Sequence, residues 1–222
     1  MGDKMKYIYI ILSIVFSFLG REATKFELIY SGNLDSNKIY LTFDDGYSAK
    51  NTESILNTLK KYDVPATFFM EGDFLVQNPA LIKRIADEQT LANHTMCHCD
   101  ITKLSNDALK KDILEFEQKA LQITGKEVTK YFRPPMGYIN EEKGQLLADI
   151  GYKIFMWNVK IYDYKNYDDL GFDYAYNNIV KQVKNGSIIL MHTLTKSNAD
   201  ALPKIIDTLR SKGFEFAQLS EI

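Results

Sequence analysis

The three histidines of this 222-residue chain all stand in short motifs whose residue types can do hydrolytic chemistry. His94 and His98 are four residues apart, and His192 ends an apolar run. Upstream, two adjacent carboxylates, Asp44 and Asp45, follow a short β-like segment. Two imidazoles and one carboxylate make a divalent-metal site with open coordination positions, and the second carboxylate and third histidine are left as a base and an acid. This set suits metal-assisted hydrolysis.

Each of these motifs has an ordinary explanation when it is taken alone. An Asp-Asp-Gly also makes a common turn, paired histidines also occur on surfaces, and a strand-ending histidine can be a core residue. The spacing of His94 and His98 would place both imidazoles on one face of a helical turn, which is a metal-ligand spacing. The site hypothesis is favoured because every ordinary explanation would have to hold at once.

Strand and helix signals alternate along the chain from residue 38 onward. Amphipathic helical periods lie between the β-like segments, and some have a capping residue such as Ser105 or a terminating glycine such as Gly125. The β-like segments are 39–43, 66–70, 91–92, 131–133, 152–157, 187–191 and 214–217. This alternation predicts one α/β domain with about seven parallel strands, closed into a barrel.

The candidate residues share one position relative to these elements. The aspartate pair, the histidine pair, Arg133, Asp163 and His192 each lie at or just beyond the C-terminal end of a predicted strand. In α/β barrels those ends form one face, where active sites are built. We therefore expect these residues to converge on a single site.

Composition bears on the partners of the chain. Lys and Arg (27) nearly balance Asp and Glu (29), and no basic block or stripe is visible, so we expect no nucleic-acid partner. A hydrophobic content of 45% is that of a globular protein. We expect one catalytic domain over residues 25–222, acting as a monomer.

The N-terminus carries a separate signal. Lys4 and Lys6 precede an apolar stretch, residues 7–19, that is shorter than the roughly 20 residues of a membrane span and is typical of a secretory signal. A good cleavage site is missing. We therefore expect residues 1–24 to direct export, as a cleaved signal peptide or as a membrane anchor with a short linker. The protein would then lie outside the cytoplasm, at the cell wall or membrane. A hydrophobic first strand of the core is the alternative.

The two cysteines, Cys97 and Cys99, flank His98. Cysteines so close in sequence rarely form an unstrained disulfide, so we expect none. We expect them to be small buried residues. Free thiols that extend the metal coordination, or that make the site sensitive to oxidation, are the alternative.

The motifs T-F-D-D-G, H-T-x-x-H, R-P-P-x-G and L-M-H, in this order and spacing, resemble those of the polysaccharide deacetylases. These enzymes hydrolyse N-acetyl or O-acetyl groups on sugar polymers. The resemblance covers about residues 38–222. It implies a distorted (β/α) barrel, a glycan polymer as substrate, and one divalent metal, zinc in the first place, with cobalt or manganese as alternatives.

Carried over by position, Asp45, His94 and His98 would bind the metal, and Asp44 would be the general base. The metal would lower the pKa of a bound water and polarise the acetyl carbonyl, and Asp44 would take the proton from that water. His192 would protonate the departing amine, for which it must be cationic near neutral pH.

Further residues would support this base and acid. Asp163 is the candidate for the carboxylate that raises the pKa of His192, and Arg133 would orient either Asp44 or Asp163. A backbone N–H of the R-P-P-M-G loop, with Met136 as the candidate, would help to hold the oxyanion. The remaining candidates for substrate contacts are Pro135, Gly137, Tyr164 and Leu190.

The segment from His192 to Leu202 is similar to the branch of the family that deacetylates N-acetylmuramic acid in peptidoglycan, on the way to the muramic δ-lactam of spore cortex. We expect that substrate here. The same machinery on N-acetylglucosamine of peptidoglycan, chitin oligomers or acetylated xylan is an alternative. A membrane-tethered, non-catalytic glycan-binding module is another, although a degenerate enzyme would be expected to lose Asp44, Arg133 or His192 first.

Overall fold

The computed structural model of the chain describes residues 25–163 and 169–222. In this part of the chain the strands form one nine-stranded sheet with the order β1-β6-β5-β4-β3-β2-β8-β7, and β9 pairs with β2. The strand ladders are parallel. The strands are β1 (Leu28–Ile29), β2 (Lys38–Asp45), β3 (Ala66–Met70), β4 (Thr90–Asn93), β5 (Tyr131–Phe132), β6 (Lys153–Phe155), β7 (Val159–Lys160), β8 (Ile188–His192) and β9 (Glu215–Phe216).

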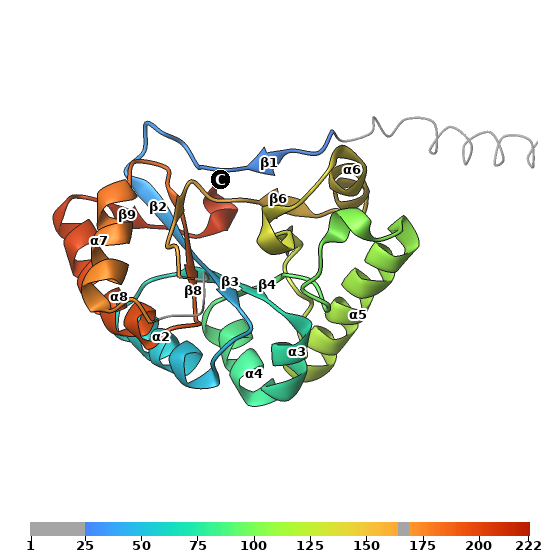
Figure 1. Cartoon of the computed structure of the whole chain (residues 1–222), viewed down its shortest axis with the longest axis horizontal. Helices are drawn as coiled ribbons and strands as arrows, with labels where there is room; N and C mark the ends of the chain where they lie inside the picture. The colour runs from blue at the N-terminus through green and yellow to red at the C-terminus, as the bar shows by residue number, and fades with distance from the viewer. Residues whose placement is uncertain (1–24, 164–168) are drawn as a thin grey trace, which may run out of the picture.

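The helices form an arc around the outside of the curled sheet, and β1 runs along the opposite side (Figure 1). Each parallel crossover between the longer strands contains at least one helix, as parallel pairing requires. The helices are α2 (Ala49–Tyr62), α3 (Gly72–Gln77), α4 (Pro79–Glu88), α5 (Asn106–Thr124), α6 (Glu141–Asp149), α7 (Phe172–Gln182) and α8 (Lys196–Ser211). Short 3₁₀ turns lie at Ile101–Lys103, Pro135–Gly137 and Leu219–Glu221.

Alternate side chains of the central strands supply two apolar layers. One layer, which includes Phe43 and Phe68 with ring centroids 5.0 Å apart, packs between the sheet and the surrounding helices. The other, which includes Phe69 and Ile188, fills the concave side of the sheet. Burying a side chain of this size stabilises the fold by about 1.5–3 kcal/mol. Strands packed on both faces are held in one register, which fixes the positions of the residues at their ends.

The predicted distorted α/β barrel is confirmed as a curled parallel sheet whose two ends are β1 and β7. The predicted strand 66–70 matches β3, and the predicted caps Ser105 and Gly125 bound α5. Two strands, β1 and β7, and helix α3 were not predicted. They are two to six residues long, too short for a hydrophobic period to develop.

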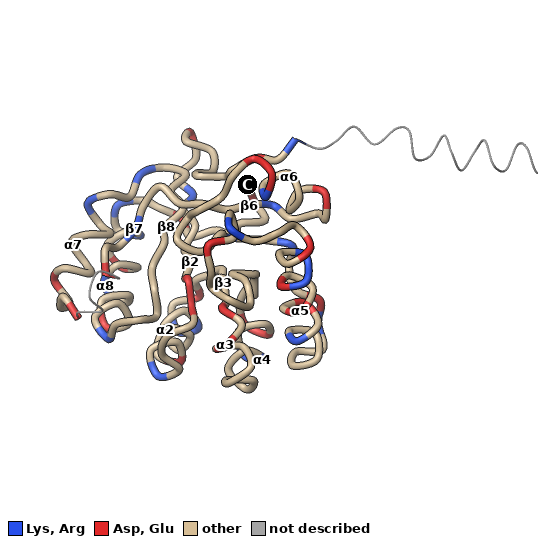
Figure 2. The backbone as a smooth tube through the Cα atoms, turned by 45° about the vertical axis from the view of Figure 1, so that its right-hand side comes forward, with Lys and Arg blue, Asp and Glu red and all other residues tan. Residues whose placement is uncertain are grey.

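The predicted export segment, residues 1–24, lies outside the described residues. Among the helices that the structure describes, none is long and apolar enough to cross a membrane. Figure 2 shows that basic and acidic residues are interspersed over the helices and loops, and that acidic residues stand at the end of β2.

Candidate active site

Asp44, at the C-terminal end of β2, is held by a buried arginine that follows β5. Arg133 Nη1 donates hydrogen bonds to Asp44 Oδ1 (2.7 Å) and to the Thr42 hydroxyl (2.9 Å). Its remaining nitrogens donate to the carbonyls of Phe155 and Met156. The side chain of Arg133 is fully buried. Because all three guanidinium nitrogens are used, the arginine can offer the Asp44 carboxylate only one orientation.

The charge balance keeps Asp44 ionised. Burial alone would raise the pKa of its carboxyl, but the electrostatic interactions with Arg133 first, and then with the two histidine rings His94 and His192, outweigh burial and lower the pKa below its usual value. The sequence left open whether Arg133 pairs with Asp44 or Asp163, and the structure places it on Asp44. A carboxylate held anionic in one orientation can accept a proton from a nearby water.

His192 lies directly across the ladder from Asp44, because β2 and β8 pair with these two residues in register. Its Nδ1 is 2.7 Å from Asp163 Oδ1. Burial lowers the pKa of His192, but the hydrogen bond and charge of Asp163, with the charge of Asp44, reverse this, and the net pKa is raised. The imidazole is therefore favoured as a cation. Since Nδ1 is committed to Asp163, Nε2 carries the proton that can be transferred.

Asn198, in the first turn of α8, holds this pair together and was not identified from the sequence. Its Nδ2 donates to Asp163 Oδ2 (2.5 Å) and to the His192 carbonyl (2.9 Å). Its own Oδ1 is buried with no hydrogen-bond partner. The only sequence signal for Asn198 was that it lies in the segment that follows His192.

His94 and His98 come together with ring centroids 5.1 Å apart. His94 Nδ1 lies 2.8 Å from the Arg133 carbonyl, which can only accept, so Nδ1 carries the proton and Nε2 has a lone pair. Burial lowers the pKa of His94 to about 4, the largest of several effects, so the ring is neutral at pH 7. Neutral imidazole with a free Nε2 is the form that ligates metals.

The predicted helical turn between the two histidines is wrong. Residues 94–98 form a loop in which Thr95 and His98 have positive φ angles of 73° and 44°. Side-chain acceptors replace helical bonds: Asn93 accepts from the Thr95 N–H, and the Thr95 hydroxyl accepts from the His98 N–H. Asp112 of α5 accepts from the N–H groups of the two residues between them.

The prediction that Cys97 and Cys99 are unbridged, buried residues is also wrong. They form a disulfide, and Cys97 is exposed. The left-handed backbone of His98 turns the chain so that the cysteine Cα atoms lie 5.2 Å apart, within disulfide range. The bridge therefore closes a small ring around one of the candidate metal ligands.

Asp45 is fully buried and is surrounded by hydroxyl groups. The Thr52 hydroxyl lies 2.9 and 3.0 Å from its two oxygens, and the Thr193 hydroxyl lies 2.5 Å from Oδ1. Burial raises the pKa of Asp45 to about 7, although the hydrogen bonds of Thr193 and Thr52 oppose the rise. The carboxylate is thus positioned by α2 and by the segment after β8.

A further carboxylate, Glu71, stands at this end of the sheet and was not identified from the sequence. It follows β3, and its Oε1 is 3.5 Å from His98 Nε2. Burial raises the pKa of Glu71 to about 7, and the charges of Asp45 and Asp44 add to the rise. The signal that could have found it was its place directly after a predicted buried strand, as for the other site residues.

The donor set can be tested against a divalent cation. Among the described residues, no three His, Cys, Asp or Glu side chains meet closely enough, as they stand, to hold an ion. Two nitrogen–oxygen pairs do face each other: His94 Nε2 and Asp44 Oδ2 at 3.6 Å, and His98 Nε2 and Glu71 Oε1 at 3.5 Å. Such distances are too long for hydrogen bonds but close to the roughly 3.4 Å that separates two ligands of a tetrahedral zinc.

The charges of these residues also fit a bound divalent cation. Three carboxylates, those of Asp44, Asp45 and Glu71, lie close enough to act on one another, while the two imidazoles have lowered pKa values. Arg133 compensates one carboxylate by direct contact. Buried like charges need a cation or protons to balance them. The residues present therefore fit a divalent cation in donor type and charge, with His94, His98 and a carboxylate, Asp45 or Glu71, as the groups that would hold it and with Asp44 beside it.

The loop after Arg133 carries the substrate candidates. Pro135 is buried, Met136 is 52% exposed with a φ of 58°, and Gly137 packs near Trp157. The turn's hydrogen bonds use the N–H groups of Gly137 and Tyr138, not that of Met136. The predicted oxyanion role of the Met136 N–H stays a prediction. Leu190 is buried on β8, two residues before His192, and Tyr164 lies outside the described residues.

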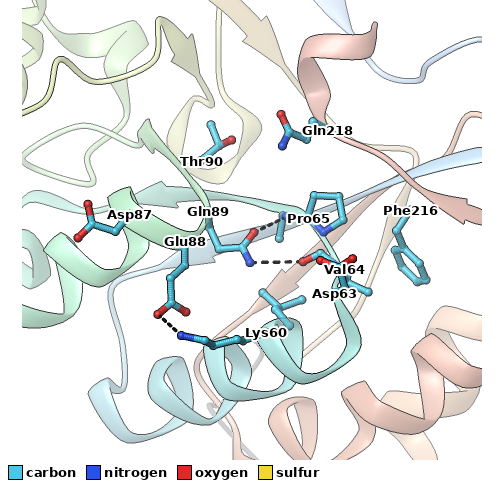
Figure 3. A pocket seen from close by; sticks show the side chains of 12 residues that line it. Lys60, Asp63, Val64, Pro65, Asp87, Glu88, Gln89, Thr90, Phe216 and Gln218 are labelled. Carbon is cyan, nitrogen blue, oxygen red and sulfur yellow. Dashed lines mark hydrogen bonds and ion pairs between the residues drawn. The ribbon is translucent and has the colours of Figure 1, made fainter.

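A large hollow, about 750 Å³, lies at the other end of the strands (Figure 3). It is lined by the segments that lead into β3 and β4, so it is remote from the motif residues. Its polar groups largely satisfy one another: Gln89 bonds the Ala66 N–H and the Val64 carbonyl, and Lys60 pairs with Glu88. Two of its carboxylates, Asp87 and Glu88, are engaged in ion pairs with Lys126 and Lys60.

A carboxylate favoured as an anion and an imidazole favoured as a cation stand on paired strands, beside imidazoles suited to a cation, and this set is suited to the hydrolysis of an amide or ester. The fold and the site thus define an α/β-barrel hydrolase. Sequence comparison specifies the family. The model of the polysaccharide deacetylase family matches residues 31–155, and the chain belongs to this family.

Similar proteins span most of the chain. The peptidoglycan-N-acetylmuramic acid deacetylase PdaA of Bacillus subtilis is 36% identical over 199 residues, 89% of this chain and 76% of that protein. Its solved structure, a family 4 carbohydrate esterase, matches with a TM-score of 0.84 over 87% of this chain and 83% of that one. The peptidoglycan-N-acetylglucosamine deacetylase PgdA of Listeria monocytogenes is 35% identical over 84% of this chain and 39% of its own length. A CE4 family pseudoenzyme of Bacillus anthracis is 28% identical, with a TM-score of 0.81 over 88% of this chain and 68% of its own.

Proposed function

We propose that this protein is a divalent-cation-dependent hydrolase that removes N-acetyl groups from peptidoglycan sugars, with N-acetylmuramic acid as the substrate. The observation that carries the proposal is the pairing of Arg133 with Asp44 and of Asp163 with His192 across two adjacent strands. It supplies a base and an acid with opposite charge preferences at one place. That is the requirement for adding water to an amide and expelling an amine.

The residues divide the reaction into two proton transfers. Asp44 accepts a proton from water as the water oxygen bonds to the acetyl carbonyl carbon. His192 Nε2 then donates a proton to the amide nitrogen as the carbon–nitrogen bond breaks, which leaves acetate and a free amine on the sugar. Arg133 keeps Asp44 anionic and oriented, and Asp163 keeps the imidazole protonated until the transfer.

A divalent cation, when bound, would polarise the acetyl carbonyl and acidify water. Asp45, His94 and His98 are the proposed ligands, and zinc is the proposed ion, with cobalt or manganese as alternatives. His94 is prepared for this role by its bond to the Arg133 carbonyl, which leaves Nε2 unprotonated. The Met136 N–H is the proposed additional donor to the developing oxyanion.

Two observations support muramic acid as the sugar. The segment from His192 to Leu202 resembles the muramic branch of the family, and a relative named for that substrate is 36% identical over 89% of this chain. Deacetylated muramic acid is the precursor of the muramic δ-lactam in spore cortex, which we propose as the destination of the product. N-acetylglucosamine in peptidoglycan is the second candidate, supported by the 35% identity to PgdA.

A non-catalytic glycan-binding module is the remaining candidate, since a pseudoenzyme shares the fold. The assembly of Asp44, Arg133 and His192 argues against it. A protein that only binds glycan does not need a carboxylate favoured as an anion opposite an imidazole favoured as a cation. We further propose that residues 1–24 direct export to the cell wall or membrane, because the substrate is found there and the segment has the features of a signal.

The proposal is tested by mass spectrometry of glycans after incubation with the zinc-loaded protein. One substrate is peptidoglycan stripped of its stem peptides, and the other is a chitin oligomer. Loss of one acetyl group on muramic residues alone is the expected result, and loss of a further water would show lactam closure by the same protein. Deacetylation of glucosamine residues alone would replace the substrate and keep the mechanism. Failure to deacetylate either polymer, with cation bound, would overturn the enzymatic proposal.

A further inference from the structure

Glu71 is a largely enclosed carboxylate near the motif residues, and the proposed reaction does not use it. It is the residue between β3 and α3, and its N–H donates to the Asp45 carbonyl at 2.9 Å. The next residue, Gly72, donates to the carbonyl of Thr95, in the loop that carries the two histidines. Glu71 is thus tied by backbone bonds both to the aspartate strand and to the histidine loop. Its position relative to them is set by the sheet and does not depend on a mobile side chain.

The neighbouring backbone makes room for the Glu71 side chain. A Cβ added at Gly46 would lie 2.3 Å from Glu71 Cδ and 2.5 Å from Oε2. Any other residue at position 46 would therefore push the carboxylate away. The side chain is only 13% exposed, and a hydrogen bond with Tyr47 holds it from the β2–α2 connection. Glu71 is consequently built into the site and does not reach into solvent.

One oxygen of this carboxylate has no protein donor. Glu71 Oε1 is buried and makes no hydrogen bond, and it faces His98 Nε2 at 3.5 Å. Burying an unpaired carboxylate is costly, and more so with Asp44 and Asp45 close enough to repel it. The separation from His98 Nε2 is too long for a hydrogen bond but close to the roughly 3.4 Å between two ligands of one tetrahedral cation. A bound cation would pair with the Glu71 carboxylate and would also reduce its repulsion from Asp44 and Asp45.

We propose that Glu71 is an additional carboxylate of the metal site, which gives Oε1 to the same cation as His98. The inference rests on the proposed divalent-cation site and extends its ligand set beyond the motif residues. A further oxygen ligand makes the site more anionic and more tolerant of cations that prefer oxygen, such as Mn²⁺. Glu71 then explains how His98, which lies on a loop beyond the strands, is held toward the sheet.

The experiment measures cation binding and not turnover. Zn²⁺ and Co²⁺ are titrated by calorimetry into the metal-free full chain as wild type, Glu71→Gln and Glu71→Asp. Glutamine has the same shape without the charge, and aspartate keeps the charge but withdraws the oxygen by one methylene. Both variants are expected to bind the cation about 10- to 100-fold more weakly. The visible absorption of bound Co²⁺, which reports its coordination, is expected to change in both.

Asp73→Asn is the matched control, because Asp73 is an exposed carboxylate two residues away, in the first turn of α3. It should bind Zn²⁺ like the wild type. If Asp73→Asn and Glu71→Gln lost Zn²⁺ affinity equally, the loss would come from the change in net charge and not from a lost ligand, and the inference would be overturned. Thermal unfolding without cation separates a structural role: Glu71→Gln should be at least as stable as wild type, since it removes an unpaired buried charge.

The remaining outcomes of these measurements also test the proposed role of Glu71. Unchanged affinity and an unchanged Co²⁺ spectrum in Glu71→Gln would overturn the role of Glu71 while leaving the proposed function standing. A wild-type chain that binds neither cation would overturn this inference together with the cation dependence in the proposed function. A Glu71→Gln variant less stable than wild type without cation would make Glu71 a structural residue and would likewise overturn the inference.

Discussion

At the scale of single residues, the site works by giving chemically similar groups different neighbours. Asp44 contacts a guanidinium and has a lowered pKa, whereas Asp45 contacts only neutral donors and has a pKa raised to about 7. His94 is neutral and His192 is favoured as a cation for the same kind of reason. Burial is common to all four, so the contacts decide which group is suited to the proposed role of base, ligand or acid.

The two adjacent aspartates should therefore respond differently to the same substitution. Asp44→Asn removes the base without touching a proposed ligand, and we expect turnover to fall by about 10²- to 10⁴-fold while cation affinity stays near that of the wild type. Asp45→Asn should lower cation affinity as well. Deacetylation rates and calorimetric titration of Zn²⁺ on both variants make the comparison. Full activity in either variant would contradict the mechanism.

The pH dependence of the reaction should report the His192–Asp163 pair. A histidine acid must be protonated, so activity is lost as pH rises through its pKa, which Asp163 raises. Asp163→Asn removes that contribution, and we expect the alkaline side of the pH profile to move to lower pH and the maximal rate to fall. The measurement is kcat/KM from pH 5 to 9. If the alkaline limb does not move, the loss of activity at high pH is caused by the deprotonation of a group other than His192.

At the scale of elements, the site residues come from several strand ends and are oriented by helices packed outside the sheet. Asn198 reaches from α8 to the acid pair, Thr52 reaches from α2 to Asp45, and Asp112 reaches from α5 to the histidine loop. Each of these three helices thus supplies a side chain that holds a loop or carboxylate of the site. Packing of the helices against the sheet fixes the distances between these groups, which a loop alone would not do.

The Cys97–Cys99 bridge belongs to this scale, because it restricts the backbone of the His98 loop. Opening it lets His98 leave its left-handed conformation, and holding one residue's backbone costs about 1–2 kcal/mol. We expect the double variant Cys97→Ser/Cys99→Ser to bind Zn²⁺ about 10-fold more weakly while the fold stays intact.

Calorimetric titration together with thermal unfolding checks this expectation. Treating the wild type with a dithiol reductant should reproduce the loss, and the double variant should not respond to that treatment. Cation affinity in the double variant equal to that of the wild type would show that the Asp112 contacts alone fix the loop.

At the scale of the whole molecule, cation binding should be coupled to stability and to pH. A cation that binds only the folded chain raises its unfolding temperature. The pKa values of Asp45 and Glu71 are raised to about 7, so below pH 7 protons compete with the cation for these carboxylates. We expect the rise in unfolding temperature on adding Zn²⁺ to be large at pH 8 and to shrink as pH falls to 6. Equal stabilisation at both pH values would mean that neither carboxylate binds the cation.

Much of the fold, and the position of most candidate site residues at one end of the sheet, could be predicted from residue order. Hydrophobic periodicity identified the central strands and the long helices, because burial on a sheet or a helix face imposes a period on the sequence. Motif residues at strand ends identified Asp44, Arg133 and His192, because parallel strands bring those ends to one face. Both inferences rest on local patterns that repeat along the chain.

Only the tertiary structure decided which side chains contact one another at the site. It placed Arg133 on Asp44, brought in Asn198 and Glu71, and joined Cys97 to Cys99. Some of these contacts join residues that share no sequence period. The disulfide depends on the left-handed backbone of His98, which no local sequence pattern predicted. A side chain's type and its strand are properties of the chain. The charge it carries and the atom it faces depend on the groups that folding packs around it.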